Sequence, residues 1–372
     1  MRVLQVGKYY PPVRGGMETH LQLLCGELRR RVALEVIVSN VAPRTVHEVV
    51  DAVPVTRCAR LALVASTPIC PTMPRELSSR HYDVLHLHFP NPMSVLSYLA
   101  SRTPASHRLV ITYHSDVVRQ RRLLKLFRPF MHKVLQRADA IICTSKNYLA
   151  SSEELQPYRA KCHSIPLGID LSRFSDIERH EVEAARVRER FPGLRIIGVG
   201  RLIYYKGFEH AIRAMRKVDG HLLIVGDGPL RRSLAALASE CGVAERVHLL
   251  GNLDEDATMA HYLASDVFVL PSVARSEAFG VVQLEAMACG LPVVNTALDS
   301  GVPFVSRDGE SGFTVPPGDP DALASAMSRL KDAPELRRTL GSAGRKRVHL
   351  EFSKETMAER VLEIYSALGP NP

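Results

Sequence analysis

Short apolar runs rich in β-branched residues alternate with amphipathic stretches along the whole chain, and this alternation constrains the fold more than any other feature. It is typical of parallel sheets whose strands are joined by helical crossovers. Most of the runs are apolar throughout, as expected for strands that are covered on both faces. The predicted strands are Arg2–Gly7, Leu34–Ser39, Asp83–Phe89, Leu109–Tyr113, Ala140–Thr144, Arg195–Gly200, His221–Gly226, Val247–Gly251, Val267–Pro271 and Pro292–Thr296.

The length of the chain indicates two domains. At 372 residues it is too long for one ordinary hydrophobic core, and it suits two domains of roughly 150–200 residues each. A charged, helix-prone stretch, Asp176–Arg190, lies between the two sets of predicted strands, so we expect a hinge near residues 170–192. A last amphipathic segment covers Ser353–Leu368. Its apolar residues at helical spacing are Met357, Val361, Leu362 and Tyr365.

Composition argues against several classes of protein. The seven cysteines are odd in number and include no C-x-x-C pair, which argues against a disulfide framework and a thiolate zinc site. No stretch approaches the ~20 apolar residues of a membrane span. The apolar run at Met1–Gly7 is too short for a signal peptide, so we expect a cytoplasmic protein. The net charge of +9 favours contact with phosphorylated ligands, nucleic acid or anionic lipid.

Two adjacent glycines, Gly15 and Gly16, follow the first predicted strand and open the first helix. Such glycines let a ligand approach free backbone N–H groups, which suits a phosphate or a sugar hydroxyl. A tight strand-to-helix turn uses glycines as well, so both interpretations stay open. Neither the G-x-G-x-x-G pattern of dinucleotide-binding proteins nor the Walker pattern of P-loop enzymes occurs, so those two classes have no local support.

The loop and helix that follow the strand Val267–Pro271 carry the strongest pattern. A helix is expected from about Phe279 to Cys289, with Glu277 in the loop and Glu285 about one and a half turns into the helix. Two carboxylates so placed can hold different hydroxyls of one ligand, while free N–H groups at the helix start face its phosphate. The alternative is that Glu277 caps the helix and Glu285 is an exposed helical residue.

Six segments together resemble the retaining family-4 glycosyltransferases, which have the GT-B fold. Glu277 and Glu285, with seven residues between them, resemble that family's E-x7-E region. The other five segments fall in the family's order: the Gly15-Gly16 loop, Thr112–Asp116, Pro166–Asp170, Gly200–Gly207 and Val225–Pro229. The resemblance covers essentially the whole chain, and the combination is more specific than any single motif.

The resemblance implies an α/β fold of two Rossmann-like domains that face a central cleft. The N-terminal domain would cover residues 1–174 and bind the acceptor. The C-terminal domain would cover residues 175–352 and bind a nucleotide-sugar donor. A C-terminal helix over residues 353–372 would cross back and pack on the N-terminal domain. Ligands of such sheets bind beyond the carboxyl ends of the strands.

The resemblance also implies roles for individual residues. Arg201 and Lys206 would bind the donor diphosphate and neutralise the charge that develops on it as the glycosidic bond breaks. Glu277 would hold the transferred sugar, Glu285 would bind the ribose hydroxyls, and His114 would lie close to the sugar. The implied catalytic residues are His114, Arg201, Lys206 and Glu277. The implied donor-binding residues are Gly15, Gly16, Arg201, Lys206, Gly251, Asn252, Leu253, Glu277, Ala278, Phe279, Gly280, Val281 and Glu285.

Structural alternatives stay open for several of these residues. Arg201 and Lys206 are otherwise ordinary surface cations, and His114, which follows a predicted strand, is otherwise a structural histidine. Asp170 is interpreted as a turn or hinge residue. His86 and His88 alternate on one predicted strand, but no third ligand is evident, which argues against a metal site.

Two D-x-D patterns begin at Asp254 and Asp319. Such a pair holds a divalent metal in a different glycosyltransferase architecture. Both patterns stand just before helix-like stretches, where acidic residues cap helix starts. We interpret them as caps and expect no metal and no other cofactor, since Arg201 and Lys206 can supply the positive charge.

The positive charge of the chain is partly local. Residues 117–137 carry seven cations and no acidic residue, interleaved with leucine and phenylalanine. A basic helix of this kind can lie on anionic lipid, so one interpretation is peripheral contact of residues 119–137 with the inner face of the cell membrane. The other is a solvated helix whose leucines pack on the sheet, which Pro129 is expected to kink or split. No nucleic-acid recognition motif accompanies the charges, so no nucleic-acid partner is expected.

The resemblance implies an enzyme of polysaccharide biosynthesis. It would transfer a hexose, with mannose slightly favoured, from a GDP- or UDP-sugar to a hydroxyl of a glycan or lipid-linked glycan. The resemblance implies that the anomeric configuration is retained. Two alternatives stay open: a sugar-nucleotide epimerase of the same architecture would act on the donor alone, and a non-catalytic membrane-associated protein would bind the sugar without turnover.

Overall fold

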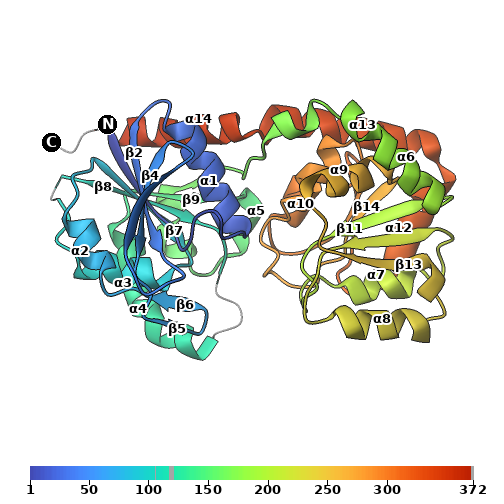
Figure 1. Ribbon diagram of the computed structural model, residues 1–372, viewed down its shortest axis with the longest axis horizontal. Coiled ribbons are helices and arrows are strands. Elements are labelled where there is room, and N and C mark those ends of the chain that lie inside the picture. Colours follow the sequence, from blue (N-terminus) through green and yellow to red (C-terminus); the bar gives the residue numbers. More distant parts are fainter. Residues whose placement is uncertain (105, 117–120, 370–372) are drawn as a thin grey trace. The chain divides into compact units, whose positions relative to one another are not determined.

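The computed structural model of the protein describes residues 1–104, 106–116 and 121–369 (Figure 1). The chain divides into two compact α/β units, one of Met1–Gly168 with Lys354–Pro372 and one of Ile169–Ser353. The division follows Gly168, whereas the sequence suggested a boundary after residue 174. The last residues of the predicted C-terminal segment, 370–372, and part of the basic segment, 117–120, lie outside the described residues.

The first unit is built on an eight-stranded sheet in which every pairing is parallel except that of β3 with β4. In spatial order its strands are β10 (Cys162–Ser164), β9 (Ala140–Cys143), β8 (Arg108–Tyr113), β7 (Val84–Phe89), β1 (Arg2–Val6), β2 (Ala33–Ser39), β4 (Val53–Cys58) and β3 (Val46–Val50). The chain builds outward from β1 in one direction and from β7 in the other. The order therefore reverses between these two strands, which is where open parallel sheets bind ligands.

Helices cover both faces of this sheet. α1 (Gly16–Leu28) contacts α14 (Lys354–Leu368), and a second contacting group consists of α2 (Met73–Ser78), α3 (Pro92–Ala100) and α4 (Arg121–Arg137) (Figure 1). The remaining elements are α5 (Lys146–Ser151), the 3-10 helix η1 (Gln156–Lys161) and a hairpin of β5 (Ala62–Val64) and β6 (Thr67–Ile69). In α14 the predicted apolar face is confirmed, because Met357, Val361 and Tyr365 are buried in the core of this unit.

The second unit has a six-stranded sheet that is parallel throughout. In spatial order its strands are β13 (Val247–Gly251), β12 (His221–Val225), β11 (Arg195–Val199), β14 (Val267–Leu270), β15 (Val293–Thr296) and β16 (Gly312–Val315). Its chain order reverses between β11 and β14, so these two strands flank the expected ligand site of this sheet.

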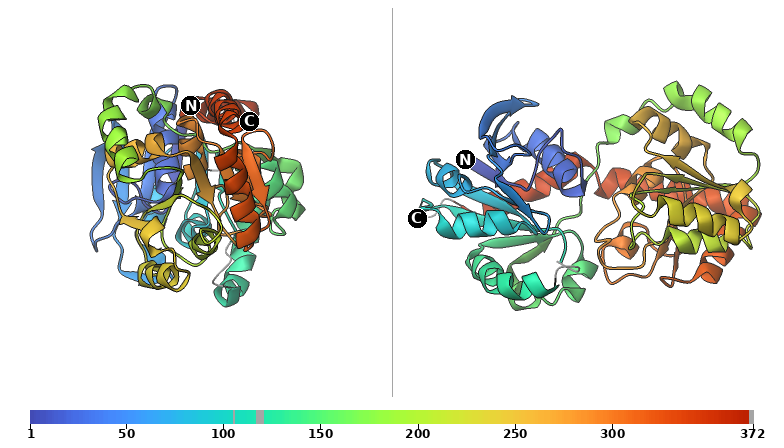
Figure 2. Two further views of the ribbon diagram at one scale, coloured as in Figure 1. Left: turned by 90° about the vertical axis from the view of Figure 1, so that its right-hand side faces the viewer. Right: turned by 60° about the horizontal axis from the view of Figure 1, so that its bottom comes forward.

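Helices also cover both faces of the second sheet. They are α6 (Glu181–Arg190), α7 (Phe208–Ala214), α8 (Arg231–Glu240), α9 (Glu255–Ala264), α10 (Val282–Ala288), α11 (Val302–Val305), α12 (Pro320–Asp332) and α13 (Pro334–Glu351). The short 3-10 helices are η2 (Leu171–Phe174), η3 (Glu178–His180) and η4 (Ala244–Arg246). α7 contacts α8 and α12, while α6 contacts α9. The right-hand view of Figure 2 shows the strands of each unit with helices on either side.

All ten predicted strands are present, and the α/β prediction with two parallel sheets is confirmed. Six strands were missed: the edge strands β3, β10 and β16, the inner strand β4, and the hairpin strands β5 and β6. β3 and β5 have no buried side chain, β4 is interrupted by Pro54 and Arg57, and β6, β10 and β16 are short, so none has the long apolar run that identifies a buried strand.

Two predicted helices differ from the structure. The helix expected from Phe279 begins at Val282, because Gly280 turns the chain with a φ of +73°. α4 runs through Pro129 from Arg121 to Arg137, so the proline does not split the helix, and the alternative prediction of a kink stays a prediction. No helix within the described part of the chain is long and apolar enough to span a membrane.

Candidate active site

Two loops of the second unit meet where its strand order reverses. The loop after β11 carries Lys206, and the loop after β14 carries Glu277. The Lys206 Nζ atom lies 2.6 Å from Oε2 of Glu277, and each side chain is only 10% exposed. Ser272 donates its hydroxyl to the same carboxylate oxygen over 3.1 Å. The structure therefore joins two predicted site residues in one buried ion pair, which excludes the alternative of Lys206 as an ordinary surface cation.

Close approach of the two loops depends on Gly207, which has a φ of +65°. A Cβ atom at this position would lie 2.0 Å from the carbonyl oxygen of Pro271, so only glycine lets the backbones come together. The Val273 N–H group bonds the carbonyl oxygen of Tyr205 over 2.8 Å and ties the same two loops. Lys206 is thereby held against the loop that contains Glu277.

Glu285 lies in the first turn of α10 and faces α9. Its Oε2 atom accepts a hydrogen bond from the Tyr262 hydroxyl at 3.1 Å, and its Oε1 atom lies 4.0 Å from Nη1 of Arg173. Burial raises the pKa of the Glu285 carboxyl, and Arg173 and Tyr262 offset that only in part. The interpretation of Glu285 as an exposed helical residue is wrong.

Glu277 does not cap α10 either. The N-cap position belongs to Val281, and no side chain caps this helix start. The carboxylate of Glu277 instead accepts from Lys206 and Ser272. Of the neighbouring predicted residues, Phe279 packs its buried ring near Phe304, and the Ala278 carbonyl accepts from the N–H group of Gly301.

Other predicted donor residues lie at the carboxyl edge of the same sheet. Arg201 follows the end of β11 and is exposed. Within the described residues its guanidinium makes no hydrogen bond or ion pair. Gly251 ends β13 with a φ of +76°, and its carbonyl oxygen accepts from the Gly226 N–H group over 2.7 Å. Asn252 and Leu253 follow it and lead into α9. Because parallel strands end at one edge, these residues share that edge with Lys206.

The remaining predicted site residues belong to the first unit. α1 begins at Gly16, with Gly15 as an N-cap that has no side-chain bond. A Cβ atom at Gly16 would meet nothing within 4 Å, so the backbone there is open to a ligand. His114 follows β8 and is buried, and its Nε2 atom lies 3.2 Å from Nδ1 of His88.

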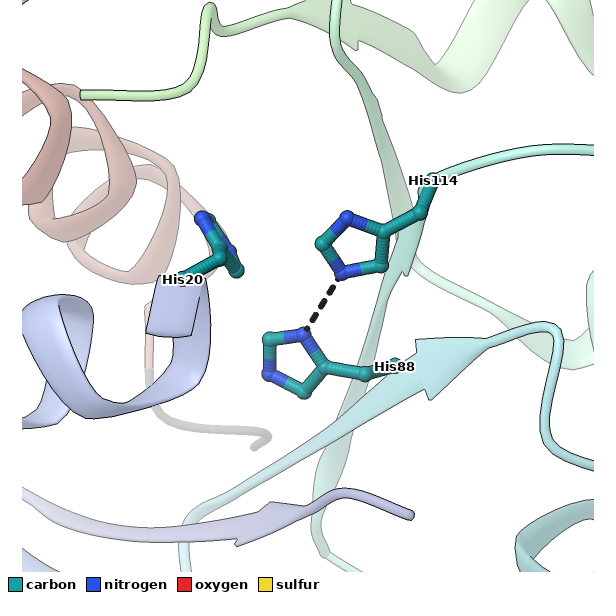
Figure 3. A group of neighbouring side chains, drawn as sticks. All are labelled: His20, His88 and His114. Carbon is teal, nitrogen blue, oxygen red and sulfur yellow. Dashed lines mark hydrogen bonds between the residues drawn. The ribbon is translucent and has the colours of Figure 1, made fainter. Parts of the chain in front are cut away.

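His20, early in α1, completes a group of three histidines with His88 and His114 (Figure 3). The sequence showed no third ligand beside His86 and His88, whereas the structure brings His88 together with two other histidines. His86 does share a face with His88, and their rings stack at 4.7 Å between centroids. His86 nevertheless turns away from the group, because its Nε2 atom is 2.7 Å from the Thr112 hydroxyl.

Burial determines the charge of these imidazoles. It lowers the pKa of His20 to about 4 and holds the pKa values of His88 and His114 well below 6.5. All three rings are neutral at pH 7. His114 can therefore offer a sugar hydroxyl an N–H group or a lone pair, but not a positive charge.

Both D-x-D patterns act as helix caps, as predicted. Asp254 accepts from the N–H group of Ala257 at 2.8 Å and caps α9. Asp319 accepts from the N–H groups of Asp321 and Ala322 at 3.0 and 2.9 Å and caps α12. Asp170 likewise caps η2, in agreement with its interpretation as a turn residue.

Four residues of the site were missed in the sequence. Ser272 lies two residues beyond the end of β14, which is a usable signal. His20 lies near the start of the helix that begins at Gly16. It was missed because the two histidines that it meets lie far from it in the sequence. Tyr262 and Arg173 come from α9 and η2 and have no local pattern, since only the tertiary fold brings them to Glu285.

Comparisons with known proteins agree with this arrangement. Residues 14–173 match the family described as Glycosyltransferase Family 4, and residues 185–347 match the family described as Glycosyl transferases group 1. The O-antigen chain mannosyltransferase C of Escherichia coli is 33% identical over 99% of both chains. The D-rhamnosyltransferase WbpZ of Pseudomonas aeruginosa is 36% identical over 72% of this chain and 68% of its own.

Two further similarities cover the chain almost completely. A GDP-mannose-dependent alpha-(1-6)-phosphatidylinositol monomannoside mannosyltransferase of Mycolicibacterium smegmatis is 29% identical over 98% of both chains. The solved structure of sucrose-phosphate synthase from Thermosynechococcus elongatus superposes with a TM-score of 0.81 at 26% identity, over 99% of both chains.

The protein is a glycosyltransferase of the GT-B fold. Each of its two α/β units has a largely parallel sheet, and the second unit holds a buried cation–carboxylate pair where its strand order reverses. The chain belongs to glycosyltransferase family 4.

Proposed function

We propose that this protein transfers a hexose, with mannose favoured, from a nucleoside diphosphate sugar to a hydroxyl of a glycan or lipid-linked glycan, with retention of the anomeric configuration. The observation that carries the proposal is the buried Lys206–Glu277 pair between β11 and β14. It holds a cation and a carboxylate, the two groups that a diphosphate and a sugar hydroxyl require, at the position where open parallel sheets bind ligands.

The charges of the second unit suit a diphosphate leaving group. A donor diphosphate would give Lys206 a second anionic partner, and the exposed Arg201 guanidinium would add charge-assisted hydrogen bonds from the same edge. Both cations become more effective as negative charge grows on the departing phosphate. Glu277 would then accept hydrogen bonds from the sugar hydroxyls, and Glu285 from those of the ribose. We infer that neither a metal ion nor another cofactor is required for transfer.

The surroundings of Glu277 support a retaining reaction without a covalent intermediate. Its carboxylate is engaged by Lys206 and Ser272, which makes it a poor nucleophile. We infer that the bond from the sugar to the diphosphate breaks first, and that an oxygen of the departing phosphate takes the proton of the acceptor hydroxyl on the same face. NMR of the product tests this step, and an inverted anomer would contradict it.

The names of the relatives support mannose and GDP. Two are named as mannosyltransferases, one of them GDP-mannose-dependent, while the D-rhamnosyltransferase leaves a 6-deoxyhexose as a competitor. A thermal-shift screen of GDP-mannose, other GDP-sugars and UDP-sugars tests the choice, because a ligand that binds the native state raises the melting temperature. A larger shift with UDP-sugars than with GDP-mannose would overturn it.

Helix α4 supports docking on an anionic membrane at the cytoplasmic face. Leu123, Leu126 and Phe130 are 49%, 74% and 47% exposed. Lys125 and Arg128 are exposed on the same helix, although Arg128 also pairs with Glu154 at 3.1 Å. Apolar side chains beside cations suit the boundary between lipid headgroups and acyl chains. The preceding cation Arg119 lies outside the described residues.

Activity is tested with purified full-length protein, GDP-mannose and a panel of lipid-linked and free oligosaccharide acceptors. We expect release of GDP that depends on the acceptor, together with an acceptor product one hexose larger. Conversion of the donor when no acceptor is added would favour a sugar-nucleotide epimerase instead. Donor binding without turnover over the whole panel would favour a sugar-binding protein.

A further inference from the structure

The three histidines of the first unit converge from separate elements. His20 comes from α1, His88 from β7 and His114 from the residue that follows β8 (Figure 3). One ring nitrogen of each lies within 4.8 Å of the corresponding nitrogens of the other two. The group sits at the carboxyl ends of β7 and β8 and beside the helix that follows β1, which is where this sheet reverses its strand order.

His20 is a buried polar side chain without a hydrogen bond. It is 6% exposed, and neither ring nitrogen has a partner among the residues that the structure describes. Its ring packs edge-on against His114, with 4.8 Å between centroids. A buried polar group without a hydrogen bond costs about 1–3 kcal/mol of folding stability. The unpartnered ring of His20 therefore indicates that a ligand binds there.

His88 has the proton arrangement of a metal ligand. Its Nε2 atom is 2.9 Å from Oε1 of Gln5, which can only accept, so the proton of the neutral ring is on Nε2. The lone pair is then on Nδ1, which faces His114. Gln5 is held in turn by the bond from its Nε2 atom to the Tyr365 hydroxyl at 2.9 Å. A histidine that binds a metal through one nitrogen usually donates the other N–H to an acceptor in this way.

The spacing of His88 and His114 also suits a tetrahedral ion, and a nitrogen of His20 lies within 4.8 Å of both. Nδ1 of His88 and Nε2 of His114 are 3.2 Å apart. Two nitrogens that each lie ~2.0–2.1 Å from one tetrahedral zinc ion are about 3.3 Å apart. The rings are neutral, which is the form a metal binds. A cavity of about 10 Å³ beside His88, which Lys8 and Glu18 also line, is just large enough for one water molecule.

We propose that His20, His88 and His114 form a binding site for a divalent transition metal ion such as Zn²⁺. The ion binds a ring nitrogen of His20, which otherwise has no hydrogen-bond partner in the described part of the chain, and it replaces the hydrogen bond between His88 and His114. His114 moves its proton to Nδ1, so that Nε2 becomes a ligand. Three imidazoles and an open fourth position are a donor set that zinc accepts, and the outer hydrogen bond to Gln5 orients His88.

Metal binding at this site has a consequence that rests on the proposed function. The family resemblance gives His114 a position beside the transferred sugar. An ion bound to Nε2 of His114 removes that contact, so Zn²⁺ inhibits transfer instead of assisting it.

Binding is tested on the full-length protein after metals have been removed with EDTA and the chelator washed out. We expect CoCl₂ to produce the visible absorption of tetrahedral Co²⁺ at one ion per chain, and ZnCl₂ to displace it. His20→Gln removes a ligand, so its Kd for Co²⁺ should rise by more than the ~10–100-fold that loss of an outer hydrogen bond costs. The matched control is His81→Gln, at an exposed histidine of the same unit, which should bind as the wild type does.

A second measurement guards against a variant that misfolds. Zn²⁺ should raise the melting temperature of the wild type and of His81→Gln, and leave that of His20→Gln unchanged, with far-UV circular dichroism equal in all three. A folded His20→Gln protein that binds Co²⁺ as tightly as the wild type overturns the site. So does a wild type with neither the absorption band nor the thermal shift.

Inhibition is measured in the transfer assay on the same samples. We expect Zn²⁺ to lower the rate of the wild type and of His81→Gln at the concentration that saturates the absorption change. Binding without any loss of rate overturns the inhibitory consequence. A protein that binds Zn²⁺ but transfers no sugar in its absence contradicts the proposed function and leaves the metal site standing, so the two failures are distinguishable.

Discussion

The ammonium group of Lys206 and the carboxylate of Glu277 form a 2.6 Å ion pair in which both side chains are nine-tenths buried. Each residue comes from a different loop, and each loop follows one of the two strands between which the second sheet reverses its order. The pair therefore has two roles. It neutralises two charges that burial would otherwise make costly, and it keeps both groups available for a charged ligand.

Removal of one member of this pair should destabilise the second unit. Lys206→Ala leaves the Glu277 carboxylate buried without its cation, and loss of one partner of a buried pair costs roughly 3–5 kcal/mol. Thermal and urea unfolding measure the change. The double variant Lys206→Met with Glu277→Gln removes both charges and should recover most of the stability while staying inactive. A double variant as unstable as Lys206→Ala would contradict this role of the pair.

Glu285→Gln should weaken donor binding without destabilising the fold. The side-chain amide of the variant can still accept a hydrogen bond from Tyr262. Arg173 retains its other ion pair, with Glu255 at 3.6 Å, so its charge is not left without a partner. Hydrogen bonds to a charged acceptor are each worth about 1.5–3 kcal/mol, so we expect the Kd for the donor to rise about 10–100-fold. Isothermal titration calorimetry with GDP-mannose measures it. An unchanged Kd would remove Glu285 from the donor site.

The stability effect of Glu285→Gln should depend on pH. Burial raises the pKa of Glu285 in the folded protein, so the folded state binds its proton more tightly than the unfolded chain. The stabilisation from this carboxyl is present below its unfolded pKa and is lost as pH rises through the folded value. Glu285→Gln should therefore raise the melting temperature at pH 7, and the gain should shrink near pH 4. The control is Glu153→Gln, at an exposed turn position after α5 and outside any helix end, which should show no such trend.

Gly207→Ala should weaken both the fold and the donor site. The added Cβ atom would meet the carbonyl oxygen of Pro271 at 2.0 Å and push apart the loops that hold Lys206 and Glu277. Gly193→Ala is the matched control, because Gly193 also has a positive φ, +81°, but its Cβ atom would meet nothing within 4 Å. The control should lose only the ~1–2 kcal/mol of a left-handed residue, whereas Gly207→Ala should lose more and bind donor more weakly. Equal losses in the two variants would argue against the close approach as the cause.

Substitutions on α4 test membrane docking. Leu126→Ser and Phe130→Ser remove apolar surface from the exposed side of α4, and each buried CH₂ group contributes about 0.8 kcal/mol to partition into lipid. We expect both variants to bind vesicles that contain phosphatidylglycerol more weakly in a sedimentation assay, with unchanged kinetics on a soluble acceptor. Val182→Ser, at an exposed residue of α6 in the other unit, is the control. Wild-type vesicle binding by the α4 variants would exclude this helix as the docking surface.

The two capping aspartates provide a test of metal independence. Asp254→Ala and Asp319→Ala each remove a helix cap, so each should cost about 1 kcal/mol of stability and leave transfer intact. EDTA should likewise leave the rate of the wild type unchanged. A rate that falls with EDTA and returns with Mg²⁺ or Mn²⁺ would show that a metal takes part in transfer.

Much of the fold could be predicted because its signals are local. An apolar run identifies a buried strand, an acidic residue before a helix identifies a cap, and the spacing of Met357, Val361 and Tyr365 identifies the buried face of α14. Each of these features depends on a few consecutive residues. The edge strand β3 was missed because exposed side chains leave no apolar run.

Two of the predicted site residues, Lys206 and Glu277, meet in the structure, but the sequence did not pair them. The sequence by itself determined that the chain forms two α/β units with parallel sheets. It also determined which residues lie at the carboxyl ends of the strands and which family the chain resembles. Only the tertiary structure decided that Glu277 binds Lys206, that Glu285 faces Tyr262, and that His20 completes a group with His88 and His114. These contacts join residues far apart in the chain, and the pairing of strands and the turn at Gly207 set their geometry. No local pattern records a distance of that kind.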